Sequence, residues 1–154
     1  MHRVNLRIPE IADYIKEHFV VLQLNLWGDR EVTDLDGEVT TEKKLARKYR
    51  VQFTPTIQFF PKQLAADSEK PVQEVEVWRL MGYWKPFHFK HTFVYVHEEG
   101  FKTEPNFQRW LQGRAAEYEA QGKEVDLNGY YFADPELIEK QMRPSPTLNS
   151  IIDN

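Results

Sequence analysis

The sequence predicts an α/β sandwich in which a mixed sheet of three to four strands is flanked by helices. Three observations indicate this fold class. An apolar run at residues 20–27 is typical of a buried strand. Two more strand patterns, at 53–60 and 72–80, are followed by helical patterns. A helix pattern at 41–50 lies between the first two strands, and this order predicts a parallel pair joined by a crossover helix.

The first two elements have the clearest signals. Pro9 fits the first turn of a helix, and Ile11 and Ile15 recur at helical spacing, so we expect a short amphipathic helix over 9–18. The residues from Val20 to Trp27 begin as a continuous apolar run and then alternate. This pattern predicts an internal strand that is covered on both faces.

A loop and a second helix are expected next. Residues 28–40 are rich in Asp, Glu, Gly and Thr, which predicts a surface loop. Thr40 or Thr41 can cap the helix that follows. The residues that share one face of this helix are Leu45, Ala46 and Tyr49.

The middle of the chain predicts an antiparallel hairpin with a long connection. Pro55 lies at the start of the strand pattern over 53–60, where a proline need not donate to the ladder. Val75 and Val77 alternate with charged residues in the pattern over 72–80, as expected for a strand with one wet face.

Two helices are predicted after the hairpin. The first begins at Pro86 and the second covers 104–120, ending before Gly122. Their apolar residues at helical spacing are Phe89, Phe93 and Val96, and then Phe107, Trp110, Leu111 and Ala115. We therefore expect a domain over residues 1–122 and a C-terminal extension over 123–154, with a short helix near 135–141 and a mobile tail.

Composition excludes several classes of function. The chain of 154 residues has a net charge of -4 and no basic run, which argues against nucleic-acid binding. It has no cysteine, so it can form no disulfide and no thiolate site of its own. No signal peptide, membrane span, metal site or cofactor motif is written in it, and we expect a soluble chain without a cofactor.

Two clusters of polar residues are candidates for a metal site, but neither has a complete set of ligands. His88 and His91 share a helix face without further ligands, and we expect them at the surface or its boundary. Asp34 and Asp36 followed by Gly37 resemble part of a calcium loop, but the loop positions at both ends lack acidic ligands. A solvated acidic loop is the favoured interpretation, with weak ion binding as the alternative.

Four aromatic residues gather around the end of the last strand. They are Trp78, Tyr83, Trp84 and Phe87. Aromatics at a rim can form a peptide-binding surface. The alternative, which we favour, is that most of them fill the core.

Several segments resemble the SoxW type of thioredoxin-related protein, which is associated with sulfur-oxidation gene clusters. The similarity runs over about residues 1–120. Its main elements are Phe53-Thr54-Pro55-Thr56 before an apolar strand, the order of Val20–Trp27 and Glu42–Val51, and Gly82-Tyr83 before the next helix. The resemblance implies a thioredoxin-like sandwich with a cis peptide bond before Pro55, and a bacterial, periplasmic setting.

The same resemblance implies where a partner would bind. The expected peptide-binding residues are Thr54, Pro55, Thr56, Gly82, Tyr83 and Trp84. The redox Cys-x-x-Cys of such proteins would lie just before Met1, so the sequence resembles a family member truncated at its N-terminus, and no catalytic residue is expected in it.

This resemblance leads to two possible functions. In the first, the chain is a non-catalytic thioredoxin-fold protein that binds an extended peptide or protein. In the second, it is part of a thiol–disulfide oxidoreductase whose cysteines lie upstream of an internal start. We also expect self-association through the uncovered sheet, and no binding to nucleic acid or membrane.

Overall fold

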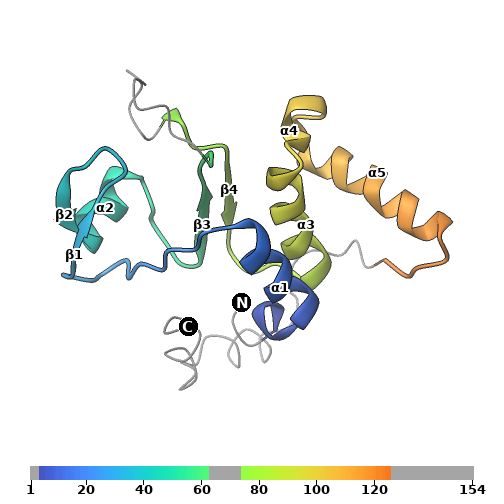
Figure 1. Cartoon of the computed structure of the whole chain (residues 1–154), viewed down its shortest axis with the longest axis horizontal. Helices are drawn as coiled ribbons and strands as arrows, with labels where there is room; N and C mark the ends of the chain where they lie inside the picture. The colour runs from blue at the N-terminus through green and yellow to red at the C-terminus, as the bar shows by residue number, and fades with distance from the viewer. Residues whose placement is uncertain (1–3, 63–73, 126–154) are drawn as a thin grey trace. The chain divides into compact units, whose positions relative to one another are not determined.

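The computed structural model describes residues 4–62 and 74–125, which form two compact units. One unit consists of residues 21–82 and contains all the strands of this described part. The other consists, among the described residues, of 4–20 with 83–125 and contains α1, α3, α4 and α5 (Figure 1). The predicted short helix at 135–141 and the tail lie outside the described residues.

The helical unit is built around α3. This helix spans Pro86–His97, and both α1 (Pro9–His18) and α5 (Phe107–Ala120) pack against it (Figure 1). Phe89 and Tyr95 are fully buried, and α3 is buried around most of its circumference, as a helix covered on two sides must be. A short 3-10 helix, η1 (Asn5–Arg7), contacts α1 and α3.

Local signals explain where the helices begin and end. Pro9 and Pro86 occupy the first turns of α1 and α3, where a missing N–H costs nothing. Asn106 caps α5, its side chain accepting a hydrogen bond from the Arg109 N–H at 3.1 Å. The predicted helix over 104–120 is α5 in the structure and begins three residues later, and a separate turn of helix, α4 (Gly100–Thr103), precedes it.

The other unit contains two antiparallel pairs of strands. In the first, β1 (Glu31–Thr33) pairs with β2 (Val39–Thr41), and α2 (Glu42–Lys48) follows directly. In the second, β3 (Thr56–Phe59) pairs with β4 (Trp78–Met81), which confirms the predicted antiparallel hairpin. Leu45 and Tyr49 form the buried core of this unit. The residues packed against them are Val32, Val51, Phe60 and Val75.

The prediction of a buried strand over 20–27 is wrong. These residues form no regular strand, and the side chains of Val20, Val21 and Leu22 are exposed. A strand needs a neighbour for its backbone N–H and C=O groups. Within the described ranges no strand pairs with this segment, so the expected parallel pair and crossover are absent there too.

The surface loop predicted over 28–40 is a hairpin instead. Gly37 turns the chain with a φ of 89°, a value that favours glycine, and the Asp34 N–H donates to the Glu38 carbonyl at 2.8 Å. None of the helices in the described part has the length and apolar character needed to cross a membrane.

Candidate functional site

Four of the six predicted site residues come together in the strand-containing unit. The Thr54–Pro55 peptide bond is cis, as the resemblance implies. The Gly82 N–H donates a hydrogen bond to the Pro55 carbonyl at 2.9 Å. Thr56 begins β3, and its hydroxyl donates to the Phe53 carbonyl at 2.7 Å. Residues 53–56 are thus fixed at the entry to β3 and joined to the end of β4.

The segment before Pro55 lies at the surface of this unit. Gln52, Phe53 and Thr54 are all exposed, although Phe53 is a large apolar residue. Thr54 makes no hydrogen bond with any residue that the structure describes. An extended peptide could therefore donate to and accept from this backbone without displacing an existing bond.

Tyr83 and Trp84, the other two predicted site residues, belong to the helical unit. Both are half-buried. The Trp84 carbonyl accepts a hydrogen bond from Asn5 Nδ2 at 2.7 Å, and its ring lies 5.6 Å from His88 and 6.2 Å from Phe107, measured between centroids. Phe87 packs on His91 with 4.1 Å between centroids. The packing of Trp84 and Phe87 agrees with the core interpretation of the aromatic cluster.

The expectation that His88 and His91 lie at the surface is wrong. Both side chains are buried, with 3% and 2% of their area exposed. The ring Nδ1 of His91 lies 2.7 Å from the Phe87 carbonyl oxygen, and Nε2 lies 3.2 Å from the Tyr118 hydroxyl. Because a carbonyl can only accept, the proton belongs on Nδ1 and Tyr118 donates to Nε2. Burial lowers the pKa of His91 to about 4, so the ring is neutral and structural.

Three residues of the acidic loop converge on one lysine. Lys48 Nζ, on α2, lies 2.5 Å from Asp34 Oδ2, 2.8 Å from Asp36 Oδ2 and 2.7 Å from Glu38 Oε2. These bonds raise the pKa of Lys48, and the bond from Lys48 lowers the pKa of Asp36. The three carboxylates lie within 4.8 Å of one another and have the chemistry to hold a cation, but the ammonium group already serves that role.

Lys48 and Tyr49 were not identified from the sequence as partners of the acidic loop. Asp34 is buried, and Tyr49 donates a hydrogen bond to its Oδ1 at 2.5 Å. The cluster therefore joins the hairpin to α2. Five acidic residues within ten positions, followed by a Lys-rich helix, are the signal that could have indicated this pairing.

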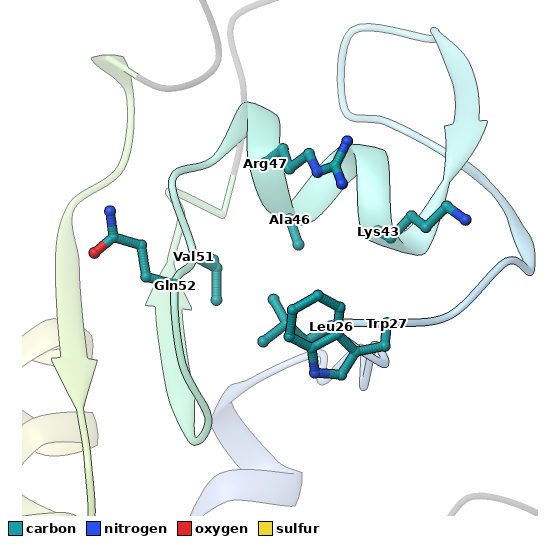
Figure 2. Close-up of a pocket in the computed structure, with 7 residues that line it drawn as sticks. All are labelled: Leu26, Trp27, Lys43, Ala46, Arg47, Val51 and Gln52. Carbon is teal, nitrogen blue, oxygen red and sulfur yellow. The ribbon is translucent and has the colours of Figure 1, made fainter.

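A pocket of about 210 Å³ lies on the same unit (Figure 2). Its residues come from the turn after residue 25, from α2, and from the segment before β3. They are Leu26, Trp27, Lys43, Ala46, Arg47, Val51 and Gln52. Figure 2 shows Ala46 and Val51 pointing toward Leu26 and the Trp27 ring. The turn is fixed to α2, because the Gly28 carbonyl accepts from the Lys43 N–H at 3.0 Å. Sequence reasoning placed Trp27 in a strand and did not find this pocket.

Comparison with known proteins gives different matches for the two ends of the chain. Residues 1–66 match the family model of a thioredoxin-like domain, which supports the thioredoxin-like resemblance of this part. Residues 108–153 match the model of monomeric isocitrate dehydrogenase. The match to the thioredoxin-like model includes α1, α2, β3 and the Thr54–Pro55 bond.

Two curated proteins match a short stretch of the chain. Isocitrate dehydrogenase (NADP) 2 of Colwellia maris is 67% identical over 33 residues, which are 21% of this chain and 4% of that enzyme. Isocitrate dehydrogenase (NADP) 2 of Psychrobacter sp. (strain 13A) is 62% identical over 34 residues, 22% of this chain and 5% of the enzyme. The chain thus spans about a twentieth of these enzymes. No solved structure matches it.

Proposed function

We propose that this chain is a thioredoxin-like protein that binds an extended peptide or protein segment at Thr54–Thr56 and Gly82. The observation that carries the proposal is the exposed residue Thr54, which makes no hydrogen bond with the described residues. It precedes β3, which pairs with one strand in the described sheet. An added strand would extend this edge by main-chain hydrogen bonds.

The site favours recognition of backbone over side chains. The Gly82 N–H holds the Pro55 carbonyl, so the loop needs no reordering before a partner pairs with it. Gly82 itself has a φ of 84°, a conformation that favours glycine and ends β4 at this point. We propose Tyr83 and Trp84 as further contributors because they follow Gly82 in the sequence. We also propose that the chain is related to SoxW-type proteins.

Peptides selected from a random library would test the proposal. Their affinity for the whole chain is measured by fluorescence anisotropy, before and after N-methylation of one peptide amide at a time. Loss of a pairing N–H should weaken binding about threefold to tenfold, the effect of one hydrogen bond. The Thr54→Ala variant keeps the backbone and should bind equally well. If N-methylation never matters, backbone pairing is refuted.

Thiol–disulfide exchange is the second candidate, favoured by the match of residues 1–66 to a thioredoxin-like model. The reaction needs a thiolate, and the 154 residues contain no cysteine. Exchange would therefore need cysteines from outside this sequence. The coding DNA before the Met1 codon tests this candidate, because an in-frame Cys-x-x-Cys would support it and a stop codon would refute it.

A further inference from the structure

The pocket between α2 and the turn at Leu26–Trp27 has the size and lining for one bulky side chain. Its volume of about 210 Å³ is below the roughly 300–1,000 Å³ of sites for drug-sized ligands. Leu26, Trp27, Ala46 and Val51 provide its apolar walls (Figure 2). Trp27 is 76% exposed, which is unusual for the largest apolar side chain and leaves the ring free to be covered.

The rim of the pocket is positively charged, and one of its two cationic side chains has no ion-pair partner among the described residues. Lys43 pairs with Asp29 at 2.5 Å. Arg47 is exposed, and its guanidinium group makes no hydrogen bond or ion pair with any residue in the described ranges. A guanidinium fork matches a carboxylate in geometry as well as in charge. An acidic group next to an apolar one would therefore complement this site.

The pocket is close to the proposed peptide site along the chain. Gln52 lines the pocket and lies two residues before Thr54. A strand rises about 3.3 Å per residue, so a segment that pairs with Thr54 reaches the pocket within two or three residues. One partner could thus occupy both places at once.

We infer that the partner segment carries a bulky apolar residue, such as Leu or Phe, and an acidic residue, Asp or Glu, two positions away from it, because alternate side chains of an extended segment lie on the same face. The apolar side chain enters the pocket against Trp27, and the carboxylate pairs with Arg47. This inference rests on the proposed function and adds to it the sequence class of the partner.

Matched peptides test it on the whole chain. Short extended peptides with blocked ends carry Leu and Glu, Ala and Glu, Leu and Gln, or Leu and Lys two positions apart at the centre, and are named after these two residues. Their affinities are measured by fluorescence anisotropy. Replacing Leu by Ala should weaken binding about tenfold or more, because a buried apolar side chain is lost. Replacing Glu by Gln should weaken it severalfold, and this difference should shrink as salt is added.

Charge reversal at Arg47 supplies the decisive comparison. Arg47→Glu should weaken the Leu-Glu peptide and strengthen the Leu-Lys peptide. Lys44→Glu is the matched control, because Lys44 is an exposed cation on α2 that does not line the pocket. Circular dichroism of both variants checks that they fold.

The outcomes separate this inference from the proposed function. Equal effects of Arg47→Glu and Lys44→Glu, or equal binding of the Leu and Ala peptides, would overturn the inference and leave peptide binding standing. If the wild-type chain binds none of these peptides and none from the random library, both fail. A preference for Leu-Glu that Arg47→Glu reverses supports the inference.

Discussion

Replacing His91 by Phe should remove the part of the pH dependence of the free energy of unfolding that comes from this one ring. The ring is 2% exposed, and its burial lowers the pKa from 6.5 to about 4. Between these two pH values the unfolded chain binds a proton that the folded chain does not. The stability from the neutral ring is therefore present above pH 6.5 and is lost as the pH falls toward 4.

The size of the effect follows from the two pKa values. Each pKa unit corresponds to about 1.4 kcal/mol, so the free energy of unfolding should fall by about 2 kcal/mol between pH 7 and pH 5 on account of this group. The assay is urea unfolding of wild type and His91→Phe at both pH values. Other groups titrate in both proteins, so comparing the two losses isolates the contribution of His91.

A matched control keeps the histidine. Tyr118→Phe removes the hydroxyl that bonds to Nε2 but leaves the bond between Nδ1 and the Phe87 carbonyl. It should lose nearly as much stability on acidification as the wild type, since burial is the largest cause of the shift. If His91→Phe loses as much stability as the wild type between pH 7 and pH 5, the assignment of a buried neutral ring is refuted.

Two further changes have expected outcomes of known sign. Lys48→Met should destabilise the chain by about 1–3 kcal/mol at pH 7, because buried Asp34 loses its cation. In urea unfolding the difference from wild type should narrow as acid protonates Asp36, whose pKa Lys48 lowers in the folded chain. Gly100→Ala should cost about 1–3 kcal/mol in thermal unfolding, since a Cβ there would lie 2.7 Å from Trp110 Nε1 and from Tyr95 Cδ2. Gly113→Ala, with open space around it in α5, should gain about 1 kcal/mol, and a stabilising Gly100→Ala would contradict this packing argument.

The helices could be predicted because their signals are local. Proline in the first turn and apolar residues at helical spacing predict both bounds of α1 and the start of α3. The burial of His88 and His91 could not be predicted in this way. It depends on α1 and α5, which both pack against α3, whereas the sequence prediction considered only the face with Phe89, Phe93 and Val96.

A strand forms only beside a partner strand, so the sequence pattern predicted one strand that is absent and missed two that are present. Residues 20–27 have strong strand propensity but no neighbouring strand in the described part of the chain. The hairpin of β1 and β2 has short, mostly exposed strands with little apolar pattern, and Asp36-Gly37 was its available signal. The candidate site at Thr54–Pro55 could be predicted because the resemblance identifies it, whereas the pocket requires three segments to meet in space.

The acidic loop was recognised in the sequence as a poor calcium loop, but the reason why its carboxylates cluster was not. Its spacing fails as a calcium loop at both ends, and the structure places a lysine where a cation would be needed. Lys48 lies ten to fourteen residues from its three carboxylates. They meet because the Gly37 turn folds the hairpin back toward α2. The ammonium group of Lys48 thus offsets part of the negative charge of the three acidic residues and links the hairpin to α2, so a role in stability explains their clustering.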